Sequence, residues 1–240
     1  GLCKGAFFQM THNEVSALSY MSSKCINQYF SAYQTRLLTL SKMPAVITAA
    51  SGDHASVKDT LSTLFTGILE SDENVVDVAI VDNSGIVVAA ANETTVQQTF
   101  FAYNDETLRT TLMGSCYISD INMNNTYFEN VIAFAVPVKD GGYLCEVVRA
   151  EAIYDLISQI DIFSSGYICI VDGKGNTINY DKKEIVNATE IMETPLASVV
   201  SRLSDVNYAD EAKHSFNENG CFGSYGKLND SGWSWIGLCT

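Results

Sequence analysis

The sequence repeats itself at an offset of 90 residues, and this repeat constrains the fold more than any other feature of the chain. Residues 79–85, Ala-Ile-Val-Asp-Asn-Ser-Gly, recur at 169–175 as Cys-Ile-Val-Asp-Gly-Lys-Gly. At the same offset, Asp-Gly-Gly-Tyr at 140–143 recurs as Asp-Ser-Gly-Trp at 230–233, each before an apolar stretch. Two matches at one offset predict two copies of one domain, over about 75–149 and 165–239.

Each copy also contains an Asp-x-x-Gly turn between two apolar runs, at Asp82–Gly85 and at Asp172–Gly175. The aspartate carboxylate can accept hydrogen bonds from the backbone amides that follow it, and glycine can take the positive φ that ends a tight turn. The pattern therefore predicts one β-hairpin at the same place in each copy.

The remaining periodicity predicts the fold class. Apolar stretches rich in β-branched residues predict strands at 75–81, 86–91, 115–120, 130–138, 142–149, 166–172, 176–180, 213–217, 221–228 and 233–238. Helical patterns fall near 56–70, 104–113, 151–160 and 192–203. Strands interrupted by helices, without regular βαβ alternation, favour an α+β fold with antiparallel sheets.

A long helix is expected before the first copy. Residues 11–14, Thr-His-Asn-Glu, have the form of a capping box, and Pro44 ends the pattern, so the helix is predicted over about 11–42. It would be about 45 Å long, with residues that contribute to both copies. A packing helix is favoured over a coiled-coil dimer because the apolar positions lack clean heptads. Its expected buried stripe is Val15, Leu18, Met21, Cys25, Tyr29, Tyr33, Leu37 and Leu40.

Composition excludes several classes of function. With 240 residues, 47% hydrophobic and 18% charged, the chain is long enough for two ordered domains. The net charge of −14 disfavours nucleic acid and favours neutral or cationic ligands over anionic ones. The seven cysteines are scattered, and those within strand patterns, such as Cys145 and Cys169, are expected to be buried free thiols.

An enzyme is not predicted. The three histidines are scattered, and no catalytic or phosphate-binding motif is present, so the sequence predicts no cofactor and no metal. No apolar run reaches the roughly 18 residues of a membrane span, and the way the chain begins and ends favours a segment of a longer protein. Four Asn-x-Ser/Thr sequons leave a glycosylated secreted protein as an alternative.

The order of several motifs resembles the double Cache family, whose PAS-like domains sense ligands outside the membrane in bacterial chemoreceptors, histidine kinases and cyclic-di-nucleotide enzymes. The long opening helix and the first Asp-Asn-Ser-Gly hairpin are part of the resemblance. The other segments that resemble the family are 112–120 (Leu-Met-Gly-Ser-Cys-Tyr-Ile-Ser-Asp), 135–140, 166–172 and the terminal Gly-Trp at 232–233.

The resemblance implies a domain order and a location. Residues 1–43 would form the long helix, 44–150 a membrane-distal Cache domain that binds the ligand, and 151–240 a membrane-proximal Cache domain. The region would lie outside the cell membrane between two transmembrane helices. A homodimer through the opening helix stays an open alternative. It would catalyse nothing itself, while the full-length protein could carry a cytoplasmic kinase or cyclase.

The resemblance also implies where the ligand would bind, near Gly114. Family members that bind amino acids place an arginine ahead of this glycine, whereas Asp105 occupies the position nine residues before it here. A neutral or amine-bearing ligand is therefore expected, with Asp120 as its main contact. The other expected contacts are Tyr117, Arg109, Asn122, Tyr103, Asp105, Tyr127 and Phe134. The alternatives are a Cache module that binds a partner protein and no ligand, and a secreted enzyme.

Overall fold

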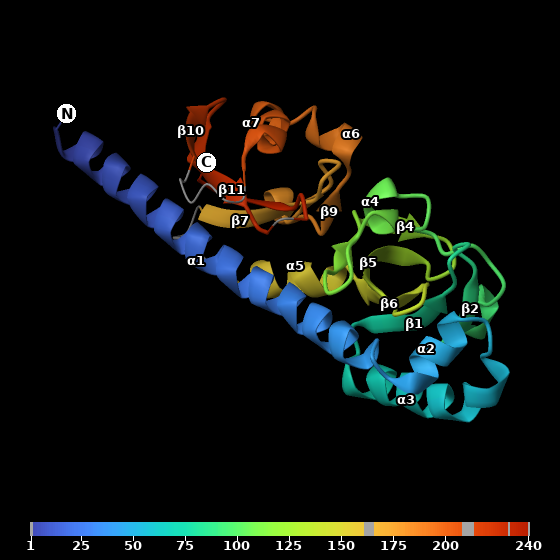
Figure 1. Ribbon diagram of the computed structural model, residues 1–240. Helices are drawn as coiled ribbons and strands as arrows, with labels where there is room; N and C mark the ends of the chain where they lie inside the picture. Colours follow the sequence, from blue (N-terminus) through green and yellow to red (C-terminus); the bar gives the residue numbers. More distant parts are fainter. Residues whose placement is uncertain (1, 161–165, 208–213, 230, 240) are drawn as a thin grey trace. The chain divides into compact units, whose positions relative to one another are not determined.

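The structure is a computed structural model that describes the backbone of residues 2–160, 166–207, 214–229 and 231–239, and their side chains from residue 13 onward (Figure 1). The chain divides into two compact units, which are described separately. The central unit is Phe30–Ala152. The terminal unit combines Gly1–Tyr29 with Ile153–Thr240.

The central unit is built on an antiparallel sheet in the order β2-β1-β6-β5-β3, with β4 also paired to β5. Its strands are β1 (Val75–Val81), β2 (Val87–Ala90), β3 (Tyr117–Ile118), β4 (Asn122–Asn124), β5 (Glu129–Pro137) and β6 (Tyr143–Arg149). The terminal unit has an antiparallel sheet in the order β10-β11-β12-β7-β8-β9. Its strands are β7 (Gly166–Val171), β8 (Thr177–Ile178), β9 (Ile185–Val186), β10 (His214–Glu218), β11 (Cys221–Lys227) and β12 (Ser234–Cys239).

The two sheets share one topology. A first hairpin, β1–β2 or β7–β8, pairs through its first strand with the last strand of the unit, β6 or β12, which in turn pairs with the strand before it. The registers differ by one residue, since Ala79 pairs with Cys145, whereas Cys169 pairs with Ile236 and not with Trp235, which follows Cys145 by 90 residues. The predicted repeat of one α+β fold is confirmed, and the strands of each copy form their own sheet.

The hairpin turns work as the sequence predicts. Asp82 Oδ1 accepts hydrogen bonds from the amides of Ser84 (2.8 Å) and Ile86 (3.0 Å). Asp172 Oδ1 accepts three backbone amides in the same way, those of residues 174–176. The two turn glycines, Gly85 and Gly175, have φ of +84° and +101°. Residues with a side chain rarely adopt such positive φ values, whereas glycine does so readily.

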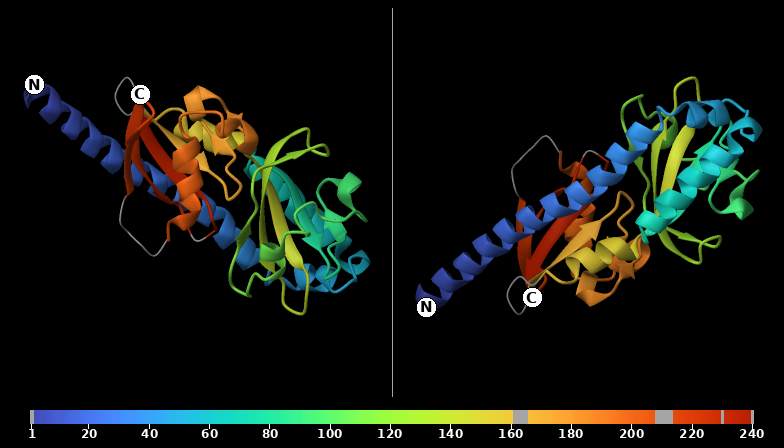
Figure 2. Two further views of the ribbon diagram at one scale, coloured as in Figure 1. Left: turned by 90° about the horizontal axis from the view of Figure 1, so that it is seen from above. Right: turned by 90° about the horizontal axis from the view of Figure 1, so that it is seen from below.

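The helices cover the sheets and connect the strands. The α-helices are α1 (Leu2–Leu40), α2 (Pro44–Ala50), α3 (Lys58–Ser71), α4 (Glu106–Arg109), α5 (Glu151–Ile157), α6 (Ala188–Ile191) and α7 (Ala197–Arg202). Short 3₁₀ helices are η1 (Ala55–Val57), η2 (Glu93–Thr95), η3 (Tyr180–Lys182) and η4 (Leu203–Asp205). In the central unit, α3 lies against one face of the sheet (Figure 2).

The predicted start of the first helix is wrong, because α1 begins at Leu2 and passes through Thr11–Glu14 without interruption. Threonine and asparagine each cost only about half a kcal/mol inside a helix, so a capping-box sequence does not force a start. No proline interrupts residues 2–10, and the single glycine there costs about 1 kcal/mol. The end near Pro44 is as predicted, and α1 contributes residues to both units.

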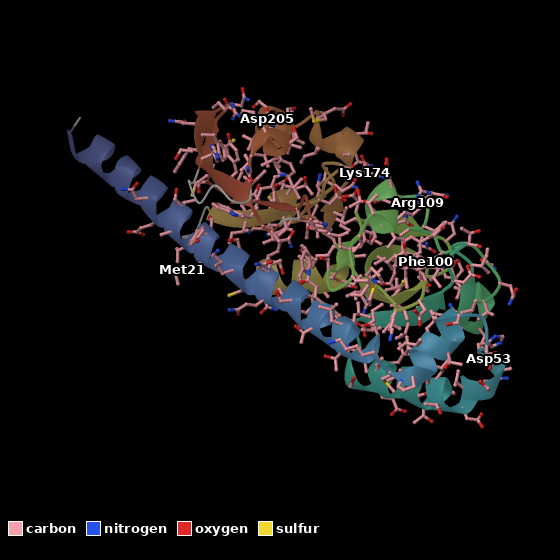
Figure 3. The ribbon with its side chains drawn as sticks, viewed as in Figure 1. Met21, Asp53, Phe100, Arg109, Lys174 and Asp205 are labelled. Atoms are coloured by element: carbon pink, nitrogen blue, oxygen red, sulfur yellow. The ribbon has the colours of Figure 1, made fainter. Side chains whose placement is uncertain are left out.

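The predicted buried stripe of α1 is right in one half and wrong in the other. In the central unit, Tyr33 and Leu37 are buried and Tyr29, at the end of the terminal unit, is half-buried. In the terminal unit the buried positions include Val15, Ser19 and Ile26, whereas Leu18, Met21 and Cys25 are exposed, and Met21 is labelled on the helix in Figure 3.

A close approach explains why a serine, and not a leucine, faces the terminal sheet. A Cβ added to Gly237 of β12 would lie 1.6 Å from Ser19 Oγ, so helix and strand meet where neither residue has bulk. Periodicity alone favoured the large apolar residues and missed this contact. Next to it, Tyr20 packs edge to face on Trp235, with ring centroids 6.5 Å apart.

Candidate ligand-binding site in the central unit

The central sheet has two differently used faces. One face presents small side chains, among them Ala79, Ala133, Ala135 and Cys145, to the segment 96–127. The other face presents larger side chains, including Phe134, to the helices. Small side chains on one face of a sheet leave room between the sheet and the loops that cross it, and a ligand site is expected there.

Asp77 is the most unusual residue on this face. It is fully buried in the middle of β1, in the sequence Val-Val-Asp-Val-Ala. Tyr127 Oη donates a 2.6 Å hydrogen bond to Asp77 Oδ2, and the amide of Asn92 donates a 2.9 Å bond to Oδ1. Burial raises the pKa of the Asp77 carboxyl, while these hydrogen bonds lower it in part. Burial and the neighbouring carboxylate likewise raise the pKa of Tyr127.

The hydrogen-bond donors that reach Asp77 from the described residues are all neutral. Within the described residues, no lysine, arginine or histidine forms an ion pair with it. A buried carboxylate without a cation is costly, and a cationic ligand would offset that cost. Asp77 also lines a cavity of about 40 Å³, together with Ala79, Phe100, Asn124 and Tyr127 among others. That volume holds about three water molecules or a small group of similar size.

A second tyrosine–carboxylate pair lies on the same face. Tyr117 Oη donates a 2.6 Å hydrogen bond to Asp105 Oδ2, and Asp105 Oδ1 caps α4 by accepting the amide of Thr107. Burial and Asp105 raise the pKa of Tyr117. Asp105 thus stands at the start of α4 and fixes it to β3, so two of the predicted contacts bind each other.

Tyr103 and Arg109 lie toward the edge of this region. Tyr103 Oη donates to the carbonyl of Asn83 at 2.7 Å, and its ring rests on Gly85, where an added Cβ would lie 2.2 Å from it. The Arg109 guanidinium is 5.9 Å from the centre of the Tyr103 ring. Figure 3 labels Arg109 on α4 and Phe100 nearer the sheet. The structure therefore brings Tyr103 and Arg109 together, outside the Asp77 cavity.

The segment around Asp120 differs from its prediction. A strand was predicted over 115–120, but β3 contains only Tyr117 and Ile118, because the Ser119 hydroxyl replaces a strand contact by accepting the amide of Ala133 at 2.8 Å. Strict alternation of faces therefore ends at Ser119. Asp120 is half-buried beyond it, and its charge contributes to the raised pKa of Tyr117. Asn122 is exposed on β4.

Phe134 lies on the opposite face of the sheet. Its ring stacks on Tyr33 at 4.9 Å and meets Phe30 edge to face at 5.5 Å. Glu146 of β6 is also on that face, fully buried, with Oε1 2.7 Å from Nη2 of Arg36. Phe134 therefore occupies the position of a core residue between sheet and α1.

Sequence reasoning missed Asp77. A usable signal was present, since a single carboxylate interrupts an otherwise apolar strand of seven residues. Attention to the segment near Gly114 favoured Asp120 instead. No group of three or more histidine, cysteine, aspartate or glutamate residues is arranged to hold a metal ion in the part of the chain that the structure describes.

No protein-family model and no curated protein matches the sequence. Solved structures do match. A domain of a sensory box/GGDEF family protein from Vibrio parahaemolyticus has a TM-score of 0.70 at 9% identity, covering 97% of both chains. The extracellular domain of a protein described as a histidine kinase, vpHK1S-Z8, has a TM-score of 0.67 at 11% identity over 96% of this chain and 91% of that one.

The sensory domain of the Campylobacter jejuni chemoreceptor Tlp3, solved with isoleucine bound, has a TM-score of 0.64 at 14% identity over 98% of this chain and 94% of that one. The chain therefore has the α+β fold of extracellular sensor domains from histidine kinases and chemoreceptors. None of its described helices is long and apolar enough to cross a membrane.

Proposed function

We propose that this chain is an extracytoplasmic small-molecule sensing module of the double Cache type, belonging to a transmembrane chemoreceptor, histidine kinase or diguanylate cyclase. The fold shared with extracellular sensor domains supports this proposal. The central unit would be the membrane-distal, ligand-binding domain, and the terminal unit the membrane-proximal one. The region itself would bind its ligand without chemical conversion.

The observation that carries the proposal is the buried carboxylate of Asp77, which faces a cavity and has only neutral donors around it. An ammonium group in that cavity would form a charge-assisted hydrogen bond with the carboxylate. Tyr127 and Thr95 would hold the carboxylate in place, since both hydroxyls lie within 3.5 Å of Asp77 Oδ2. The ligand class is therefore a small amine.

The size and charge of the surroundings narrow that class further. A cavity of about 40 Å³ fits an ammonium group with a short substituent. Asp105, which accepts Tyr117, stands where amino-acid-binding members of the double Cache family carry an arginine, so this position offers no cation for a ligand carboxylate. Small amines without a carboxylate are thus preferred over amino acids, although the Tlp3 neighbour was solved with isoleucine bound.

The residues predicted from sequence around Gly114 would then form the approach to the site. Tyr127 contacts Asp77 directly. The segment 96–127, which crosses this face of the sheet, is held by two sets of contacts. Tyr117 donates to Asp105, and Tyr103 contacts Asn83 and Arg109. Asp120 is the expected contact for any ligand longer than the cavity.

The terminal unit offers a surface for the proposed homodimer. Leu18 and Met21 of α1 are 39% and 64% exposed, and Cys25 follows them on the same side of the helix. These positions are three and four residues apart, which is the spacing of a helix–helix seam. Their exposure supports the pairing of two α1 helices.

A thermal-shift screen tests the sensing proposal. Short primary amines, the alcohols and carboxylates of the same chain length, and amino acids would each be added to the protein. A ligand at 100 times its dissociation constant stabilises the folded state by about 2.7 kcal/mol, so a binding amine raises the melting temperature and its matched alcohol does not. Stabilisation by carboxylates alone would contradict the assignment of the ligand class.

The small size of the Asp77 cavity also favours a second candidate function, in which the module responds to a partner protein. In this alternative the module binds the partner protein and no small-molecule ligand.

A further inference from the structure

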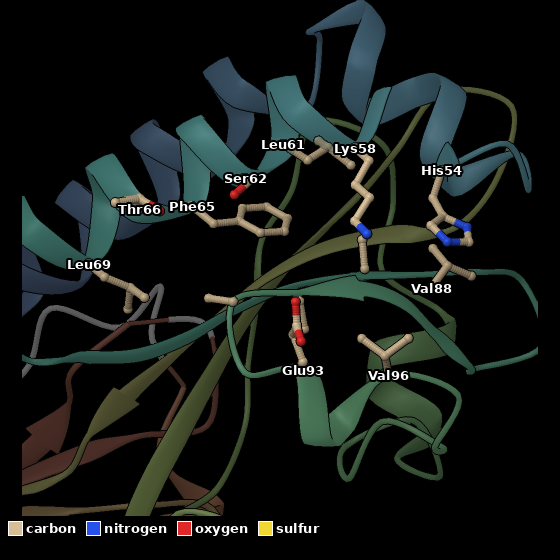
Figure 4. Close-up of a pocket in the computed structure, with 13 residues that line it drawn as sticks. His54, Lys58, Leu61, Ser62, Phe65, Thr66, Leu69, Val88, Glu93 and Val96 are labelled. Carbon is tan, nitrogen blue, oxygen red and sulfur yellow. The ribbon is translucent and has the colours of Figure 1, made fainter. Parts of the chain in front are cut away.

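The central unit has a second and larger cavity, a groove of about 420 Å³ bordered by the strand β2 (Figure 4). One wall is α3, which contributes Leu61, Phe65 and Leu69. The other wall is η2 and the residue after it, with Glu93 and Val96. Residues 88–90 of β2 and the following Ala91 form the floor. Asp77 and Tyr127 are not among its lining residues, so this groove is separate from the amine site.

The floor of the groove is the open edge of a sheet. β2 is the last strand in the order β2-β1-β6-β5-β3. Its first residue is covered, because the amide of Val87 donates to the carbonyl of Gln98 and the carbonyl of Val87 accepts the amide of Gln97. Beyond Val87 the edge runs into the groove.

The register shows which backbone groups point outward. The amide of Ala91 donates to the carbonyl of Val78 across β1, and Ala90 is opposite Ala79. Hydrogen-bonded and non-hydrogen-bonded pairs alternate in an antiparallel ladder, so the N–H and C=O of Ala90 face away from β1. Within the described residues, no group outside the sheet hydrogen-bonds to them.

Beyond Val87, the edge of β2 carries no charged residue and no proline. Natural edge strands carry charges, prolines or bulky covers that prevent another strand from pairing with them. Residues 88–91 are Val-Ala-Ala-Ala, which present little bulk and no charge. The groove beside them follows the helix face from Leu61 to Leu69, about 12 Å of α3. That length corresponds to roughly four residues of an extended chain.

The two walls carry opposite charges that the protein leaves unpaired. Lys58 of α3 and Glu93 of η2 are exposed, and neither side chain forms an ion pair or hydrogen bond within the described residues. Figure 4 shows the two side chains extending toward β2 from opposite sides. Phe65 lies on the same wall as Lys58, and Val96 on the same wall as Glu93.

We propose that this groove binds an extended peptide segment of a partner protein, which pairs with β2 at Ala90 and adds a strand to the central sheet. Side chains of a strand alternate between its two faces. Those that face α3 would meet Lys58 and Phe65, and those that face η2 would meet Glu93 and Val96. The segment therefore carries an acidic residue next to a basic one, flanked by β-branched apolar residues. Backbone pairing supplies affinity, and the walls supply specificity.

The test uses the 240-residue chain and the capped peptide acetyl-Thr-Val-Glu-Lys-Val-Thr-amide. Titration by nuclear magnetic resonance should shift the backbone amides of residues 88–91, and calorimetry should give the affinity. The same peptide with alternate backbone nitrogens methylated cannot pair with an edge strand and should bind at least tenfold more weakly. This comparison requires no change in the protein.

Two protein variants separate backbone pairing from charge. Ala90→Pro removes an outward N–H on an edge strand, where proline is tolerated, and should weaken peptide binding at least tenfold while circular dichroism stays unchanged. Lys58→Glu should weaken binding about tenfold and should prefer the peptide in which lysine replaces the glutamate. No shift at 88–91, equal binding of the methylated peptide, or binding of small amines and carboxylates in place of the peptide would overturn the proposal.

Discussion

The buried ion pair between α1 and β6 predicts a stability that depends on pH. Glu146 is fully buried, and its Oε1 lies 2.7 Å from Arg36 Nη2, which is itself 3.6 Å from Asp72 Oδ2. Burial raises the pKa of the Glu146 carboxyl from 4.5 to about 7, because the attraction of Arg36 offsets only part of the cost of removing the carboxylate from water. The substitution Glu146→Gln tests whether this carboxyl causes the pH dependence of stability.

Proton linkage determines whether the stability rises or falls with pH. Between the unfolded and the folded pKa values, the folded protein holds a proton that the unfolded chain has released, so stability decreases as pH rises through this range. With a folded pKa of about 7, the contribution of Glu146 decreases by about 2.5 kcal/mol from pH 5 to pH 8. Glutamine cannot titrate, so this part of the slope should disappear in Glu146→Gln.

The assay is urea unfolding of the wild-type protein and Glu146→Gln at pH 5, 6, 7 and 8, with Glu70→Gln, an exposed position of α3, as the matched control. The free energy of unfolding of Glu146→Gln relative to wild type should rise by about 2.5 kcal/mol between pH 5 and pH 8, while the control stays parallel to wild type. Parallel curves for all three proteins would refute the reasoning, because Glu146 would then titrate alike in both states.

Three further predictions concern the turns, the helix contact and the amine site. Gly237→Ala forces a methyl group against Ser19 and should destabilise the protein by about 1–3 kcal/mol, measured by urea unfolding; a change below 0.5 kcal/mol would contradict the close approach. Asp172→Ala should cost about 2–3 kcal/mol, because a buried carboxylate that accepts three amides and the Asn176 side chain is lost, whereas the less buried Asp82→Ala should cost about 1 kcal/mol. Equal costs would count against this reading of the two turns. The affinity for a small amine should increase with pH through the raised pKa of Asp77, since the ammonium pairs with the ionised carboxylate; calorimetry at several pH values would show a flat profile if Asp77 did not contact the amine.

The fold could be predicted from sequence to an unusual degree because the two copies corroborate each other. Segment 75–81 was predicted as a strand and is β1 to the residue, and the hairpin turns use the Asp and Gly residues that the repeat identified. A turn with a physical mechanism fixes the register of the strands beside it. Cys145 and Cys169 are buried free thiols, as their apolar neighbours predicted.

The wrong predictions of buried positions and strand ends have a common cause. Contacts between distant segments determined these features, and local sequence patterns do not contain that information. Ser19 is buried, and Met21 exposed, because Gly237 admits only a small residue at the helix contact. The strand predicted over 115–120 ends at Ile118 because the Ser119 side chain takes a backbone hydrogen bond. The short elements β4, β9 and α2 were missed, since two to seven residues carry too little periodicity.

The sequence predicted the part of the central unit in which the candidate site lies and some, but not all, of its residues. Tyr127, expected as a ligand contact, donates to the buried carboxylate, while Phe134 of β5 belongs to the opposite face of the sheet. Alternation on a strand identifies two sets of residues but not which set faces a ligand. The lone carboxylate of Asp77 in an apolar strand was visible in the sequence, but its burial and its neutral partners came only from the structure.

The most direct test of the sensing account is calorimetric titration of the best amine from the thermal-shift screen into the wild-type protein, Asp77→Asn and Asp120→Ala, with Asp172→Asn in the terminal unit as the control. Asp77→Asn keeps the shape of the side chain and removes its charge, so binding should weaken about tenfold or more while the control binds as wild type. Unchanged affinity in Asp77→Asn, with loss at Asp120→Ala or Asp172→Asn instead, would contradict the assignment of the ligand site to the buried carboxylate of the central unit.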